Sequence, residues 1–230
     1  MARLWVLVVV LLLAVGCCRS DGAARAPTAD SISYGRSATV ALVNFRKDHY
    51  PRTFCSGVWV GESTILTAAH CVSDQGVGGL VNFAQYGDSD WGPGHEARIV
   101  ETHGGTVTKL DEGVDLALIR GVTWRPHVSV SLASVIVEGE TVLIVGHPVG
   151  LLWNQTPGYV NAVRWMTGAD DSKVEQIVQI AGASFFGNSG GPALNANGEL
   201  VGICSFMVTG STMNFFVSSY EVKRFLAGVL

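Results

Sequence analysis

Short apolar stretches separated by turn-forming residues run along most of the chain. The stretches at 39–44, 57–60, 64–68, 142–145 and 200–204 are separated by clusters of Gly, Asn, Asp and Pro. Apolar runs of this length between turn residues are typical of the strands of β-sandwiches and β-barrels. The pattern therefore predicts an all-β fold.

One helix is predicted, at the C-terminal end of the chain. From about Ser219 onward, Val222, Phe225, Leu226 and Val229 recur at helical spacing. Such spacing places apolar side chains on one face of a helix. We expect this face to pack against the strands.

The N-terminus has the pattern of an export signal. Arg3 precedes an unbroken apolar run from Leu4 to Val15, which small and polar residues follow. This layout predicts a secretory signal over residues 1–18. A transmembrane helix is the alternative, but the run is shorter than the ~20 residues that span a bilayer. The Ala-Val-Gly-Cys sequence that ends at Cys17 also resembles a bacterial lipoprotein cleavage site, although Ala14 stands where leucine is usual. Cleavage there would place a lipid anchor on Cys17.

Composition and length indicate the domain organisation of the chain and argue against nucleic-acid binding. Residues 19–34, rich at first in Ala, Asp and Arg, are predicted to be a linker. Residues 35–230 are enough to bury a sizeable core, and 28 glycines in the chain indicate many turns. The net charge of −4, without a basic run, gives no electrostatic footprint for nucleic acid. We therefore expect a compact exported protein that does not bind nucleic acid.

A glycine-rich segment carries the first candidate for chemistry. Residues 187–193 read Gly-Asn-Ser-Gly-Gly-Pro-Ala, which places the Ser189 hydroxyl among backbone N–H groups that no bulky side chain shields. A substrate carbonyl could reach Ser189 with its oxygen facing the amides of Gly187 and Ser189. Taken alone, the segment could equally be a turn between strands.

Two upstream segments supply what a serine nucleophile needs, namely a base and a group that orients the base. His70 follows an apolar strand and two small residues, and Asp115 opens an otherwise apolar run. A carboxylate in that setting needs hydrogen bonds. Asp115 could accept from His70 Nδ1–H and leave Nε2 to take the proton of Ser189. His70 could instead be a core histidine and Asp115 a turn residue, but all three segments in one chain favour the catalytic interpretation.

The three segments TAAHC, DLALI and GNSGGP resemble the His, Asp and Ser motifs of the chymotrypsin/trypsin superfamily of serine proteases. The stretches 139–163 and 187–203 are most similar to the HtrA/Deg group, and the resemblance covers the chain from about residue 35. It implies two antiparallel Greek-key β-barrels that meet at about 120–132, a catalytic cleft between them and a C-terminal helix. The implied activity is serine endopeptidase, with protein or peptide substrates and no cofactor.

The resemblance also implies a disulfide bond. In the similar proteases a cystine links the strand before the catalytic histidine to the residue after it, and Cys55 and Cys71 occupy these places. Two free thiols are the alternative in a reducing compartment. Cys204 has no evident partner and is predicted to be a small buried hydrophobe.

Activation is expected to differ from that of the digestive proteases. Those enzymes pair a new N-terminal amine with an acidic residue before the serine, whereas this chain has the neutral Asn188. We therefore expect no such ion pair, and a site organised constitutively or by loop rearrangement. With the sequence ending at Leu230, we also expect no PDZ domain of the kind usual in the HtrA/Deg group.

Specificity is predicted from positions relative to Ser189. Ala183 is expected at the base of the substrate pocket, and Ser205, Phe206 and Met207 along its wall. None is acidic, so the pocket should not favour Lys or Arg, since an unpaired buried cation is costly. Small or medium apolar side chains are the hypothesis.

Two rival functions can be weighed against the protease. The segment 187–191 also fits the G-x-S-x-G elbow of α/β-hydrolases, but there the histidine follows the serine, and the last histidine here is His147. Some relatives of serine proteases are binding proteins that have lost a triad residue, whereas this chain has all three.

A metal site is not expected. His95 and His103 lie near Glu96 and Glu101, but the spacing matches no recognised zinc pattern. A solvated loop is the expected structure for this region. The sequence indicates no oligomeric state.

Overall fold

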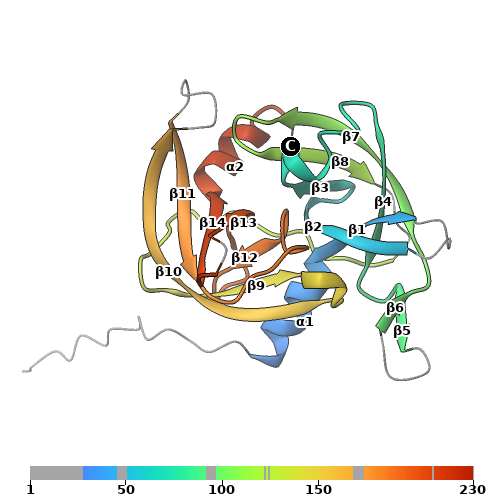
Figure 1. Cartoon of the computed structure of the whole chain (residues 1–230), viewed down its shortest axis with the longest axis horizontal. Coiled ribbons are helices and arrows are strands. Elements are labelled where there is room, and N and C mark those ends of the chain that lie inside the picture. Colours follow the sequence, from blue (N-terminus) through green and yellow to red (C-terminus); the bar gives the residue numbers. More distant parts are fainter. Residues whose placement is uncertain are drawn as a thin grey trace, which may run out of the picture.

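The part of the chain that the structure describes folds into two six-stranded barrels that lie side by side, with one α-helix before the first barrel and one after the second (Figure 1). The structure is a computed structural model that describes residues 28–45, 51–91, 97–121, 123, 125–167, 174–208 and 210–229. The predicted signal over 1–18, with Cys17, and the candidate residues His95 and Glu96 lie outside the described residues.

The first barrel is formed by the N-terminal half of the chain, drawn mainly in cyan and green in Figure 1. Its strands are β1 (Thr39–Phe45), β2 (Pro51–Gly61), β3 (Thr64–Thr67), β4 (Leu80–Gln85), β7 (His103–Asp111) and β8 (Leu116–Gly121). Their order around the barrel is β1-β2-β3-β8-β7-β4, and all pairings are antiparallel. The strands β5 (Ser89–Trp91) and β6 (Ala97–Ile99) form a separate hairpin.

The second barrel repeats this topology. Its strands are β9 (Thr141–Gly146), β10 (Asn154–Thr167), β11 (Val174–Ala181), β12 (Pro192–Leu194), β13 (Leu200–Met207) and β14 (Met213–Ser218). Their order is β9-β10-β11-β14-β13-β12, with β12 paired to β9. In both barrels the fourth strand returns to lie beside the first, which is the Greek-key order. The predicted pair of antiparallel Greek-key barrels is confirmed.

An apolar cluster shared by both barrels holds them together. It contains Leu66 and Leu118 of the first barrel, Val145 and Ile203 of the second, and Phe225 of the C-terminal helix. Burial of one such side chain contributes ~1.5–3 kcal/mol. The contact between the barrels is therefore part of the core, which keeps residues from the two halves in fixed relative positions.

The C-terminal helix α2 (Ser219–Leu226) confirms the prediction for that segment. Ser218 caps it by accepting a hydrogen bond from the Glu221 amide, and Val222, Phe225 and Leu226 are buried. The helix thus covers the shared cluster with the apolar face that the sequence shows. Val229 lies beyond the helix and packs partly against the same cluster.

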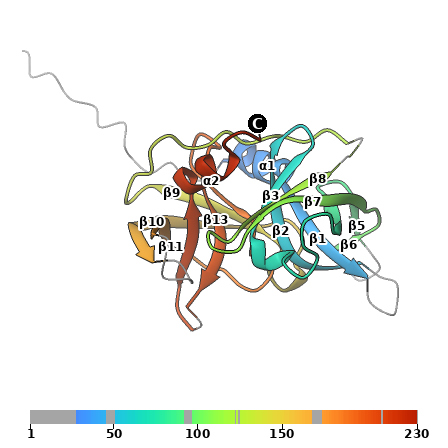
Figure 2. The same cartoon turned by 90° about the horizontal axis from the view of Figure 1, so that it is seen from above.

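A second helix, α1 (Ala29–Ala38), lies on the same side of the barrels as α2 (Figure 2) and was not predicted. The predicted linker over 19–34 is wrong for residues 28–34. The helix starts with a capping box between Thr28 and Ser31, which satisfies backbone donors of its first turn. Its apolar periodicity is weak, because it reaches the core through the small residues Gly35 and Ala38. None of the helices in the described part of the chain has the length and apolar character needed to cross a membrane.

The predicted disulfide bond joins Cys55 of β2 to Cys71, directly after His70. It closes a loop with a sequence separation of 16 residues. Cys204 is free and buried, as expected, and burial raises the pKa of its thiol to about 12.

Replacing both Cys55 and Cys71 by Ala should lower the free energy of unfolding by about 3 kcal/mol, because the unfolded chain regains the entropy that the closed loop removes. Urea unfolding of the wild type and the double variant measures the difference. A reductant should shift the wild type towards the variant and leave the variant unchanged. Equal unfolding midpoints without reductant would contradict this assignment.

Candidate active site

His70 and Asp115 are brought together by the register of two strands in the first barrel. His70 lies in a short 3₁₀ turn (Ala69–Cys71) directly after β3, and Asp115 directly precedes β8. Because β3 and β8 are antiparallel with Thr67 opposite Ala117, extending the register by two residues from each places Asp115 near the His70 turn.

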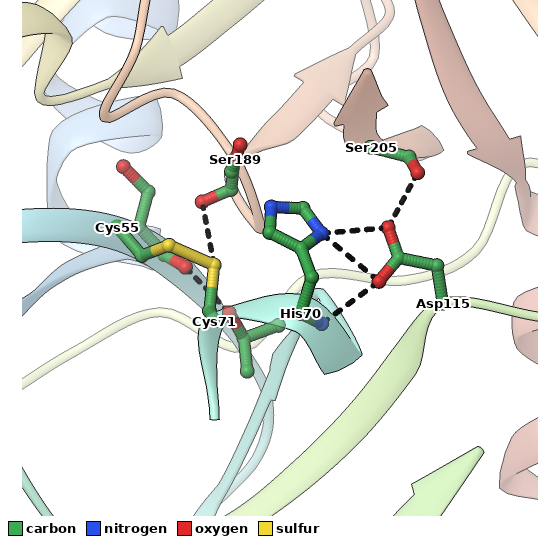
Figure 3. Close-up of polar contacts among 8 residues, drawn as sticks. Cys55, His70, Cys71, Asp115, Ser189 and Ser205 are labelled. Atoms are coloured by element: carbon green, nitrogen blue, oxygen red, sulfur yellow. Dashed lines mark hydrogen bonds and ion pairs between the residues drawn. A yellow bond between two sulfur atoms is a disulfide. The ribbon is translucent and has the colours of Figure 1, made fainter. Parts of the chain in front are cut away.

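The Asp115 carboxylate is fully engaged. It accepts a hydrogen bond of 2.9 Å from the His70 backbone amide, and its oxygens lie 3.0 and 2.9 Å from His70 Nδ1. The Ser205 hydroxyl donates to the same carboxylate. Asp115 has a φ of +55°, a left-handed conformation that Asp tolerates better than most residues. These contacts orient the imidazole, with Nδ1 facing Asp115 (Figure 3).

This pairing changes the acidity of both groups. The hydrogen bond to Asp115 raises the pKa of His70 above its ordinary 6.5, and burial opposes this rise only in part. Burial alone would raise the pKa of Asp115, but its hydrogen bonds to His70 and Ser205 outweigh this effect and lower it below 3.8. Asp115 is therefore ionised at neutral pH, and it stabilises the imidazolium form of His70.

Ser205 is a site residue whose contact the sequence did not predict. It was expected only as part of the pocket wall, whereas its hydroxyl is directed to Asp115. Its position in β13 links the second barrel to the carboxylate of the first. The sequence signal was the position of Ser205 directly after the apolar run 200–204, which is similar to the setting of His70 after an apolar strand.

Ser189 lies on the side of the His70 imidazole that faces away from Asp115 (Figure 3). No hydrogen bond joins its hydroxyl to His70 within the described chain. The Ser189 carbonyl accepts a 2.8 Å hydrogen bond from the Ser56 amide of β2, and the Cys71 sulfur lies 3.7 Å from the same oxygen. A cystine sulfur carries no proton, so the sulfur contact is one of packing. Both contacts position the Ser189 backbone beside the His70 turn.

The amides of Gly187 and Ser189 are free to bind an external oxygen. Neither donates a hydrogen bond to an acceptor within the described chain, although the neighbouring amides of Asn188, Gly190 and Gly191 all do. Unpaired N–H groups beside a nucleophile can stabilise negative charge on a substrate oxygen. The loop thus has the donors that an oxyanion hole requires.

The expected pocket residues lie in the segment before this loop and in strand β13. Strand β13 is tied to the loop by hydrogen bonds between Cys204 and both Gly190 and Gly191. Ala183 is exposed, while Phe206 stacks on Phe215 with 4.6 Å between the ring centroids. None of the four predicted pocket residues is charged.

The expected solvated loop around His103 is wrong. His103 is only 4% exposed in β7, and its Nε2 lies 2.8 Å from Asp88. Arg125 contacts Asp88 and also Glu101, at 2.8 Å. Because the guanidinium already supplies positive charge to both carboxylates, this cluster, which is buried at Asp88 and His103, is an ion-pair network and a poor cation site.

Comparisons with known proteins agree with this geometry. The family model described as trypsin-like peptidase domain matches residues 55–203. Serine protease HTRA1 of Xenopus laevis is 28% identical over 196 residues, which cover 81% of this chain and 38% of the relative. A probable periplasmic serine protease do/HhoA-like of Haemophilus influenzae is 38% identical over 96 residues, which cover 40% of this chain and 21% of that protein. The chain spans less than half the length of these relatives.

Among solved structures, the active form of the Rv3671c protease from M. tuberculosis superposes with a TM-score of 0.69. The alignment covers 86% of this chain and 82% of that one at 19% identity. The likeness confirms the two-barrel fold. The similarity to the HtrA group that the sequence predicted is confirmed by the relatives.

Asp115→Asn should lower the pKa of His70, because it weakens the hydrogen bond from His70 Nδ1–H and removes the charge that stabilises the imidazolium form. The titration of the His70 Cε1–H signal by NMR should have its midpoint above 6.5 in the wild type and a lower midpoint in the variant. Asp74→Asn, at an exposed carboxylate nearby in the sequence, is the matched control and should not shift it. A wild-type midpoint below 6.5 would contradict this account.

Proposed function

The chain belongs to the trypsin-like peptidase family, and from this premise we propose that it is a serine endopeptidase that hydrolyses proteins with Ser189, His70 and Asp115. The observation that carries the proposal is the His70–Asp115 pair with Ser189 on the opposite side of the imidazole. The free amides of Gly187 and Ser189 beside the hydroxyl support it.

The reaction is an acyl transfer in two steps. Ser189 Oγ attacks the peptide carbonyl while His70 Nε2 takes the hydroxyl proton, and the resulting oxyanion is held by the Gly187 and Ser189 N–H groups. The C–N bond then breaks as His70 gives the proton to the leaving amine, which leaves an ester on Ser189. Water, deprotonated by His70, attacks this ester and releases the acid and the free serine.

Asp115 supports this cycle without itself exchanging a proton. Its ionised carboxylate holds His70 with Nδ1–H towards Asp115, so Nε2 is the nitrogen available to Ser189. It also stabilises the imidazolium that forms at each step. Since the base must be neutral, activity should fall as the pH drops through the raised pKa of His70.

We place this activity outside the cytoplasm. The leader pattern over 1–18 supports export, with a lipid anchor at Cys17 as the alternative to full secretion. The Cys55–Cys71 bond fits an oxidising compartment. Proteins or peptides there are the proposed substrates.

Ser189→Ala should lower kcat for casein hydrolysis by about 10⁴-fold or more, because triad residues act as a unit. The fold should be intact by circular dichroism, and His70→Ala should cause a loss of similar size. Only the wild type should react with an active-site serine phosphonate. Casein cleavage by Ser189→Ala at the wild-type rate would remove the proposal.

For specificity, we propose a preference for small or medium apolar side chains before the cleaved bond. The uncharged set Ala183, Ser205, Phe206 and Met207 supports this preference. A peptide library should show kcat/KM for Arg at least about 10-fold below that for Ala or Leu. Ala183→Asp should improve cleavage after Arg and Ala183→Asn should not. A strong wild-type preference for Arg would overturn this assignment.

A further inference from the structure

A buried histidine outside the proposed mechanism lies directly behind the Gly187 loop. His147 follows β9 and is fully buried, with Nδ1 2.9 Å from the Ser56 hydroxyl of β2. The same hydroxyl is 2.7 Å from the Gly187 carbonyl oxygen. A Cβ at position 187 would overlap the His147 carbonyl, so the two backbones are in direct contact. His147, Ser56 and Gly187 thus form one continuous polar chain across both barrels.

The directions of these hydrogen bonds follow from proton counting. A carbonyl oxygen can only accept, so the single hydroxyl proton of Ser56 must point to Gly187. Ser56 Oγ must then accept from His147, which requires the proton of the neutral imidazole to sit on Nδ1. In the other tautomer a bare Nδ1 would compete for the Ser56 proton and release the Gly187 carbonyl.

The environment of the ring favours this tautomer. His147 Nε2 is buried and has no hydrogen-bond partner in the described structure, while Trp153 packs edge-on against the ring at 4.5 Å. A buried N–H without an acceptor is costly, so Nε2 is better left without a proton. Burial also lowers the pKa of His147 to about 3, which keeps the ring neutral.

Gly187 is held from both sides. The Phe186 carbonyl accepts a 2.7 Å hydrogen bond from the Val149 amide. Because C=O and N–H point in opposite directions in a trans peptide, the Gly187 N–H is directed away from Val149. Val149 has a φ of +47°, which is strained for a β-branched residue and is maintained by its surroundings. The next peptide is fixed by the Ser56 bond to the Gly187 carbonyl.

From these contacts we infer that Ser56 and His147 form a buried positioning pair that keeps the Gly187 N–H turned towards the substrate oxygen. The inference rests on the proposed function, because it assigns the pair a role in forming the oxyanion hole. His147 determines the direction of the Ser56 proton, and Ser56 fixes the Gly187 carbonyl. The Val149 amide fixes the preceding peptide through the Phe186 carbonyl. With both of its peptides held, Gly187 keeps its N–H in one direction. Neither Ser56 nor His147 touches the substrate.

Two substitutions of His147 separate positioning from packing. His147→Phe fills the ring site but has no N–H, so kcat should fall about 10- to 100-fold, less than the ~10²- to 10³-fold loss when an oxyanion donor is deleted. KM should change little. His147→Asn keeps an N–H donor on the atom next to Cγ but leaves part of the ring volume empty. It should recover most of the lost kcat while its melting temperature falls below that of His147→Phe.

Ser56→Ala should reduce kcat at least as much as His147→Phe, and should slow phosphonate labelling of Ser189 by a similar factor. His127→Phe is the matched control, because His127 stacks on Trp59 away from this site and should leave kcat unchanged. In the wild type, long-range ¹⁵N–¹H NMR correlations should show the His147 proton on Nδ1.

The outcomes distinguish the two proposals. If the wild type neither hydrolyses casein nor reacts with the phosphonate, the protease function itself fails. If the wild type is active and both His147→Phe and Ser56→Ala keep its kcat, only the positioning pair is refuted. A proton found on His147 Nε2 would also overturn the pair, without any need for activity or for a folded variant.

Discussion

The site depends on how closely the 187–191 backbone of the second barrel approaches strand β2 of the first. A Cβ at Gly190 would overlap the Thr67 hydroxyl and the Ser56 carbonyl, and one at Gly191 would overlap the Val145 carbonyl. The Ser56 amide also donates directly to the Ser189 carbonyl. Glycine is required here because only a backbone without a Cβ can lie this near to another strand. The backbone of Ser189, the proposed nucleophile, is therefore positioned by the opposite barrel.

The same strand connects the serine loop to the histidine. Cys55 directly precedes Ser56, and Cys71, its disulfide partner, directly follows His70. One covalent bond therefore joins the strand that supports Ser189 to the turn that carries His70. On the other side, Ser205 of β13 donates to Asp115. The first barrel thus supplies His70 and Asp115, the second supplies Ser189, and polar contacts at both ends hold these proposed catalytic residues in place. Side chains supported by the strands of a barrel keep their relative positions better than side chains on isolated loops.

The sequence predicted those parts of the fold and the site that depend on local pattern. The strands followed from short apolar runs, α2 from its 3.6-residue period, and the His70–Asp115 pair from the two motifs together. Helix α1 was missed because it packs through Gly35 and Ala38 and has little apolar periodicity. The spacing of apolar residues cannot predict a helix that is buried through small residues.

Contacts between distant polar residues were harder to predict. The pairing of His103 with Asp88 and Arg125, and that of His147 with Ser56, join segments that share no spacing rule. Each pairing arises only when the barrel closes and the buried groups must find partners. A polar residue at the end of an apolar strand, as at His147 and Ser205, was the one sequence signal available.

Asn188, the neutral residue before Ser189, is held by hydrogen bonds within the 184–191 segment. Asn188 is buried, and its side-chain amide donates to the Ser184 hydroxyl at 3.0 Å, while its backbone amide donates to Phe185. A carboxylate at this place would need a cation or several donors to offset its burial. With Asn188, the loop is ordered by hydrogen bonds between neutral groups, from Ser184 to Gly187, and a new amine would find no charge there to pair with. That this protein uses no activating ion pair stays a prediction, and the neutral contacts of Asn188 give it a physical reason.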